Sequence, residues 1–186
     1  AAVGVWHNPT NNTPDVVLCR VWKPQRSFLR GGKPTIDLAE TVGAEVMRLH
    51  KAGQLVGVVC DPYQLHSLIV EWQKAGIKVI ELPQSSGRVE ADQALYDSVI
   101  SQSIRHYGDP VLTEHIRNAV AIETPRGLRL AKEKTSLKID AAVALSMAMW
   151  GSRETVGRVN RRSTGMMPDP WELDSDTFNN GVLYHP

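Results

Sequence analysis

The chain has 186 residues, of which 42% are hydrophobic and 22% charged, a composition typical of one globular domain. No stretch reaches the roughly 18 consecutive apolar residues of a membrane span, and the N-terminus lacks the basic and apolar regions of a secretory signal. With 21 basic and 20 acidic side chains the net charge is +1, so any nucleic-acid-binding surface must be local. Cys19 and Cys60 lie in separate apolar runs, which favours reduced, buried thiols and a cytoplasmic protein.

The first half of the chain predicts strands and helices in alternation. Two apolar runs, Ala1–Trp6 and Asp15–Trp22, flank a polar loop and predict an antiparallel hairpin. Apolar residues spaced by three and four predict helices over 36–51 and 64–75. The short apolar runs 55–60 and 78–82 predict strands joined by the second helix in a right-handed parallel crossover.

The second half predicts helices over 91–107, 111–119 and 139–150, with a small hairpin formed by 119–123 and 128–131. The periodic pattern fades after residue 152, so we expect a domain over 1–152 and an irregular tail over 153–186. The fold class is α/β, with a mixed β-sheet that has an antiparallel hairpin edge plus parallel strands and is flanked by helices.

Two aspartates are the strongest candidates for chemistry. Asp61 follows the buried strand 55–60, and open α/β sheets place their sites at the carboxyl ends of strands. Asp140 stands at the start of an alanine-rich helix. Two carboxylates close together repel unless they share a cation, which favours Mg²⁺ or Mn²⁺. The alternatives are a turn or helix cap for Asp61 and compensation of the helix dipole for Asp140.

A basic run directly precedes Asp140. It contains five basic side chains and one acidic side chain, Glu133; the basic residues are Arg126, Arg129, Lys132, Lys134 and Lys138. Cations beside metal-binding carboxylates are suited to phosphodiester hydrolysis, because they position the phosphate backbone. The alternative is a solvated hairpin face. No zinc spacing or Walker A loop is present, so the chain itself is not an ATPase.

Several motifs together resemble the nuclease domain of the large terminase subunit of tailed bacteriophages. They are Cys60-Asp61-Pro62-Tyr63, Glu81-Leu82-Pro83-Gln84, His115-Ile116-Arg117-Asn118-Ala119 and Lys138-Ile139-Asp140-Ala141-Ala142-Val143-Ala144-Leu145, within a likeness from about Val3 to Trp150. The resemblance implies an RNase H-like fold and a metal-dependent endonuclease that cuts concatemeric double-stranded viral DNA during genome packaging.

The resemblance also implies site residues and partners. Asp61 and Asp140 would be catalytic and bind Mg²⁺ or Mn²⁺ in a two-metal site, and DNA would contact Arg129, Lys132, Lys134 and Lys138. Asp37, Gln84 and Asn118 are further candidates for the cleft, each with a helix-face or turn role as the alternative. The implied partners in the full protein are an N-terminal ATPase domain, the small terminase subunit and the portal, in the host cytoplasm, with no membrane and a monomeric isolated domain.

One part of the family pattern has no match in this sequence. The first metal-binding aspartate of the family lies on an opening strand that would precede Ala1, and Asp15, Asp37 and Asp92 do not match its position. An alternative function is therefore a DNA-binding RNase H-like module that does not cleave as isolated, with the segment Arg153–Arg162 as a contact surface.

Overall fold

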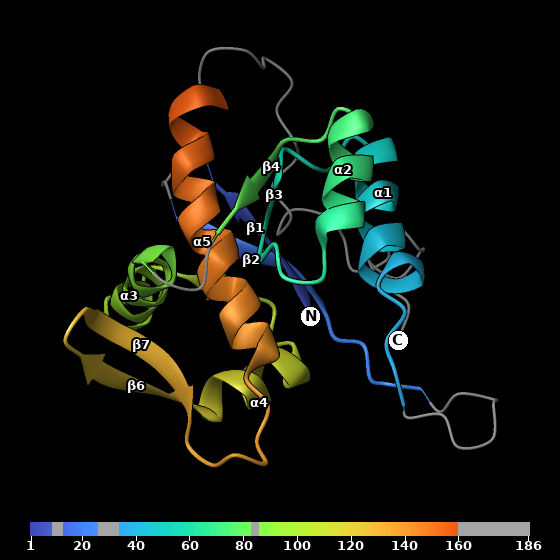
Figure 1. Cartoon of the computed structure of the whole chain (residues 1–186). Helices are drawn as coiled ribbons and strands as arrows, with labels where there is room; N and C mark the ends of the chain where they lie inside the picture. The colour runs from blue at the N-terminus through green and yellow to red at the C-terminus, as the bar shows by residue number, and fades with distance from the viewer. Residues whose placement is uncertain (9–12, 26–33, 83–85, 160–186) are drawn as a thin grey trace.

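The computed structural model describes residues 1–8, 13–25, 34–82 and 86–159 (Figure 1). The strands are β1 (Ala2–His7), β2 (Pro14–Arg20), β3 (Val58–Cys60), β4 (Val79–Glu81), β5 (Arg105–His106), β6 (Ala119–Thr124) and β7 (Gly127–Lys132). The helices are the π-helical turn η1 (Ala39–Gly43), α1 (Ala44–Lys51), α2 (His66–Lys74), α3 (Ser86–Ile100), α4 (Pro110–Arg117) and α5 (Asp140–Val159). This is the α/β fold with helices flanking strands that the sequence predicts.

The N-terminal hairpin forms as predicted. β1 pairs antiparallel with β2, from Ala2 opposite Arg20 to His7 opposite Pro14, with a register shift between Gly4 and Val5. β2 also pairs in parallel with β5, so the sheet β1-β2-β5 is mixed. β5 lies inside the range predicted as helix, and its Arg105 forms an ion pair with the fully buried Asp15 of β2.

The predicted parallel crossover is also present. β3 and β4 are parallel, with Val58, Val59 and Cys60 opposite Val79, Ile80 and Glu81, and α2 connects them. Side chains alternate along β3: Val58 and Cys60 pack in the cluster of α1 and α2, which includes the buried Trp72, whereas Val59 packs with Met147 of α5. β3 is therefore covered on both faces, as its continuous apolar sequence predicts.

Three helices depart from their predicted ranges by three residues or more at one end or both. The first helix begins at Ala39 rather than Ile36, because the Asp37 carboxylate accepts hydrogen bonds from the amides of Ala39 and Glu40. α3 is shifted toward the N-terminus of the predicted range and ends at Ile100. α5 continues to Val159, so the expectation of irregular structure is wrong for residues 153–159, and residues 160–186 lie outside the described part.

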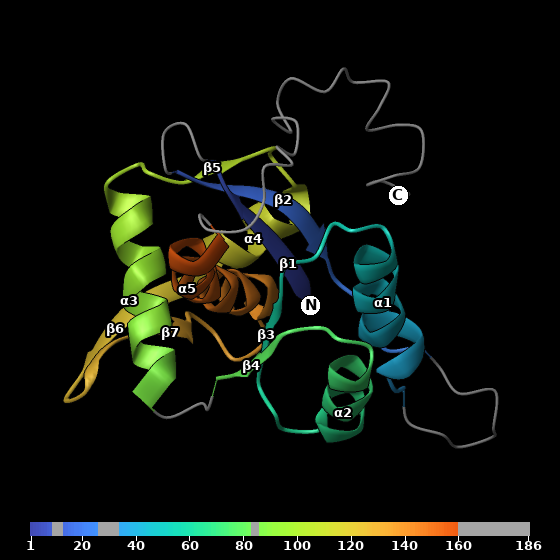
Figure 2. The ribbon, with the colours of Figure 1, turned by 90° about the horizontal axis from the view of Figure 1, so that it is seen from above.

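α5 lies at the centre of the molecule. Figures 1 and 2 place α1 and α2 on one side, and α3 with the β6–β7 hairpin on the other, with α5 between them. The strands form three separate sheets, β1-β2-β5, β3-β4 and β6-β7, and α5 packs against β1, β2 and β3. α5 thus packs against both the β1-β2-β5 sheet and the β3-β4 sheet. No helix in the described ranges is long and apolar enough to cross a membrane.

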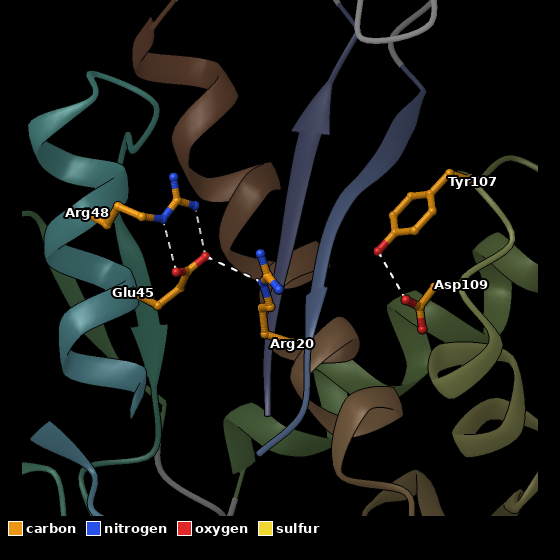
Figure 3. Close-up of polar contacts among 5 residues, drawn as sticks. All are labelled: Arg20, Glu45, Arg48, Tyr107 and Asp109. Carbon is orange, nitrogen blue, oxygen red and sulfur yellow. Dashed lines mark hydrogen bonds and ion pairs between the residues drawn. The ribbon is translucent and has the colours of Figure 1, made fainter. Parts of the chain in front are cut away.

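Polar contacts attach the first helix and α4 to their surroundings (Figure 3). Glu45 of α1 accepts hydrogen bonds from Arg48 at 2.9 and 3.0 Å and lies 3.8 Å from Arg20 of β2. The hydrogen bond from Arg48 lowers the pKa of Glu45, although partial burial opposes it. Asp109 accepts a hydrogen bond from Tyr107 and another from the amide of Leu112, which caps α4.

Candidate nuclease site

Asp61 lies at the carboxyl end of β3, where the sequence predicts it. Its Oδ1 accepts a hydrogen bond from the amide of Tyr63 at 3.0 Å, so the turn role considered as an alternative is also present. Asp61 is partly buried beside Cys60, whose thiol pKa is raised to about 11, first by burial and then by the charges of Glu81 and Asp61. Two acidic residues, Asp61 and Glu81, therefore lie close to the end of β3.

Asp140 is the first residue of α5 and is exposed to solvent. The amide dipoles at a helix N-terminus favour a carboxylate there, so the dipole role is compatible with a functional one. Asp140 also lies near the start of β1: burial lowers the pKa of the Ala1 amino group, and the charges of Asp140 and Cys19 oppose that effect. The carboxylate thus combines exposure with a fixed place at the end of a packed helix.

The two aspartates belong to elements that pack on each other. Asp61 is two residues beyond Val59, and Val59 contacts the part of α5 that contains Met147 and Gly151. In the described part of the chain, no group of three or more His, Cys, Asp and Glu side chains is placed to hold a metal ion. The link between Asp61 and Asp140 in this structure is therefore the packing of β3 against α5, and not a ready-made cluster of three ligands among these residues.

The basic residues divide into two groups. Lys134 and Lys138 are exposed in the segment between β7 and α5, directly before Asp140. Arg129 is partly buried on β7, opposite Ile122 of β6, and Lys132 is exposed at the end of the same strand. Since side chains alternate along a strand, Arg129 lies on the opposite face of the hairpin from Leu130, which packs against the core. Of these basic residues, Lys134 and Lys138 are nearest in sequence to Asp140.

The three secondary candidates have different outcomes. Asp37 caps the start of η1, which agrees with its alternative helix role. Asn118 follows α4, and its side-chain amide donates a hydrogen bond to the carbonyl of Lys138 at 3.1 Å. Gln84 lies outside the described residues, as do Arg161 and Arg162 of the predicted contact surface.

The sequence patterns did not reveal one buried carboxylate. Asp92 of α3 is fully buried and accepts hydrogen bonds from Arg88, Ser146 and the amide of Leu130. It connects α3, α5 and the hairpin that carries Arg129. The spacing of Arg88 and Asp92 by four residues was the available signal, but such pairs are usually exposed.

Comparison with known proteins shows the family to which the chain belongs. The family model described as "Terminase large subunit, endonuclease domain" matches residues 36–155. The chain therefore belongs to the terminase large-subunit endonuclease domain family, which confirms the resemblance found in its motifs.

The solved structures most relevant here come from two bacteriophages. The large terminase of bacteriophage HK97 is similar with a TM-score of 0.63 and 20% sequence identity, over 80% of this chain and 36% of that one. The large terminase nuclease of the thermophilic phage G20c has a TM-score of 0.49 and 18% identity, over 62% of this chain and 63% of that one. The similarity to the HK97 structure confirms the RNase H-like α/β fold. The comparison with curated proteins found no match.

Proposed function

We propose that this domain is a divalent-metal-dependent endonuclease that cleaves concatemeric double-stranded viral DNA during genome packaging. Family membership over residues 36–155 is the single observation that carries the proposal. The chain covers only 36% of the HK97 large terminase, so the ATPase domain, the small subunit and the portal are proposed partners of the full protein. The supporting evidence from the structure is the placement of Asp61 and Asp140 at the ends of β3 and α5.

The donor set of the candidate site is compatible with Mg²⁺ or Mn²⁺. Both ions prefer oxygen ligands, and Mg²⁺ is commonly bound through one or two carboxylates, with water and substrate phosphates completing the coordination. Asp140 is exposed and Asp61 only partly buried, so neither carboxylate is enclosed by the fold. When bound there, a divalent ion would activate the attacking water and stabilise the leaving oxygen of the phosphodiester.

The chain's own cations have a separate role in this proposal. Lys134 and Lys138 would contact phosphates next to Asp140, while Arg129 and Lys132 would extend the contact along β7. Such contacts position DNA without reading its sequence. The net charge of the whole chain is only +1, so this local run is the expected source of DNA affinity.

The deciding experiment is plasmid nicking by the chain with Mn²⁺, with Mg²⁺ and with EDTA, in parallel with Asp61→Asn and Asp140→Asn. We expect metal-dependent cleavage by the parent and its loss in both variants. Asp97→Asn is the matched control, because Asp97 is an exposed helical aspartate on α3 and is not part of the proposed site. Circular dichroism would establish that all the variants remain folded.

The outcomes separate the two candidate functions. Undiminished cleavage by either variant would refute the assignment of that aspartate. DNA binding that weakens with salt, without cleavage under any metal condition, would instead support the DNA-binding module.

A further inference from the structure

The start of α5 has an unusual hydrogen-bonding arrangement. The carbonyl of Ile139 accepts the first bond of the helix, from the amide of Val143, so Ile139 is the N-cap residue. An isoleucine side chain has no acceptor for the free amides of the first turn. These amides therefore bond to water where they are exposed, and to other parts of the fold where they are buried.

His115 of α4 provides one such partner. Its Nδ1 accepts a hydrogen bond from the amide of Ala141 at 2.9 Å, and both residues are buried, at 5% and 0% exposure. An Nδ1 that accepts a hydrogen bond carries no proton, so the neutral ring has its proton on Nε2. His115 therefore caps α5 from another helix.

Asn118 provides a second contact with the same segment. Its side-chain amide donates to the carbonyl of Lys138, three residues before Ala141. His115 and Asn118 are themselves three residues apart and share one side of the α4 terminus. The backbone is thus held on both sides of Asp140, while the Asp140 side chain remains exposed.

α4 is itself well anchored. Asp109 caps the first turn of α4 through the amide of Leu112. The Leu112 side chain is 2% exposed and belongs to the buried cluster that includes Leu95 and Leu145. The position of the segment 138–141 is consequently tied to the core through α4.

We propose that His115 and Asn118 are positioning residues that orient the Asp140 carboxylate for metal binding. The proposal rests on the proposed function, because it assumes that Asp140 binds a divalent ion. It also gives a physical role to His115 and Asn118, two residues of the motif His115-Ile116-Arg117-Asn118-Ala119. Partners that orient metal ligands are commonly worth about 10- to 100-fold in metal affinity.

The test measures Mn²⁺ binding to the full chain without DNA, by electron paramagnetic resonance of the free ion. His115→Leu removes the acceptor at similar volume, whereas His115→Asn retains a polar group that can accept near the position of Nδ1. Asn118→Leu removes the donor at similar volume without adding a charge. We expect His115→Leu and Asn118→Leu to weaken Mn²⁺ binding at least about tenfold, and His115→Asn to retain most of the parent affinity.

A second measurement follows the helix start directly. Hydrogen exchange of the peptide that contains Ala141 is expected to accelerate in His115→Leu and to stay slow in His115→Asn. Thr113→Val is the matched control, because it removes a hydrogen bond within α4, from Thr113 to the Asp109 carbonyl, without touching residues 138–141. This control is expected to bind Mn²⁺ like the parent.

The results distinguish a failure of the proposed function from a failure of the positioning role. If the parent itself neither binds Mn²⁺ nor cleaves DNA, the proposed function fails and the positioning role fails with it. If the parent binds Mn²⁺ and both His115→Leu and Asn118→Leu bind it equally well, only the positioning role is overturned. Faster hydrogen exchange at Ala141 in His115→Leu with an unchanged Mn²⁺ affinity would show that His115 is only a structural cap of α5. This result would likewise overturn the positioning role.

Discussion

Val59 of β3 lies directly against the backbone of α5 at Gly151. A β-carbon on Gly151 would be 2.1 Å from Cγ2 of Val59, which is far too close for two carbon atoms. Gly151 is buried, and the atom in its way is the γ-methyl group of a β-branched valine, which has few alternative rotamers. This close approach fixes the distance between α5 and the strand that precedes Asp61.

The contact predicts a cost for the smallest possible substitution at this position. Gly151→Ala should lower the free energy of unfolding by about 1–3 kcal/mol, because overpacking outweighs the better helix propensity of alanine. Urea denaturation would measure the change, with Arg153→Ala on the exposed face of α5 as the control. Adding Val59→Ala to Gly151→Ala should recover part of the lost stability. A Gly151→Ala protein as stable as the parent would contradict the close approach.

The buried carboxylate of Asp92 gives a second stability prediction. Asp92 and Arg88 have side-chain exposures of 0% and 7%, so removing the charge of one leaves the other buried without its ion partner. Asp92→Asn should therefore cost about 3–5 kcal/mol. Denaturation beside Asp97→Asn, an exposed aspartate of the same helix, checks the value. A cost equal to that of the control would show that the ion pair contributes little.

The two lysines before Asp140 predict a change in the salt dependence of DNA binding. Each phosphate contact contributes about 0.9 to the slope of log affinity against log salt concentration, so Lys134→Gln with Lys138→Gln should reduce the slope by about 1.8. Fluorescence anisotropy with a labelled duplex measures it. Lys74→Gln, in the last turn of α2, is the control and should keep the parent slope. An unaltered slope in the double variant would exclude these lysines from the phosphate contacts.

The thiol of Cys60 predicts a loss of stability at alkaline pH. Burial raises the pKa of this thiol in the folded protein from 9.0 to about 11. Because the folded state retains the proton more strongly, the contribution of Cys60 to stability is complete below pH 9.0 and is lost as the pH rises through about 11. Denaturation across this range should show a smaller decline in Cys60→Ala than in the parent. Parallel declines would assign the effect to other groups.

Elements with strong periodicity were predictable from the sequence. The apolar residues of β3 and β4 and the polar loop between β1 and β2 led to the correct pairings. β5 was not predictable, because Arg105 and His106 are polar and their pairing with β2 depends on Asp15, 90 residues earlier in the chain. At the shifted start of α3, Gly87 lies against the side chain of Leu82, where a β-carbon would be 2.5 Å from Cδ1, and local sequence does not predict this contact.

In the candidate site too, some residues were predictable from the sequence and others were not. Asp61 and Asp140 were identified because each follows or begins a strongly patterned element. The role of His115 could not be inferred from local sequence, because its partner is the amide of a residue 26 positions later. Only the fold shows which backbone group this side chain meets.

The packing of Gly151 on β3 has a consequence for how this domain tolerates changes in length. Asp140 and Gly151 lie on one continuous helix, so the direction of the carboxylate is linked to the β3 contact by the helical repeat. Inserting or deleting one residue between them would turn Asp140 by roughly 100° relative to Val59, and inserting a whole turn would displace it by about 5.4 Å. The stretch of α5 between these two residues thus has a length that the proposed site cannot vary, and every residue from 141 to 150 is buried or half-buried in the fold.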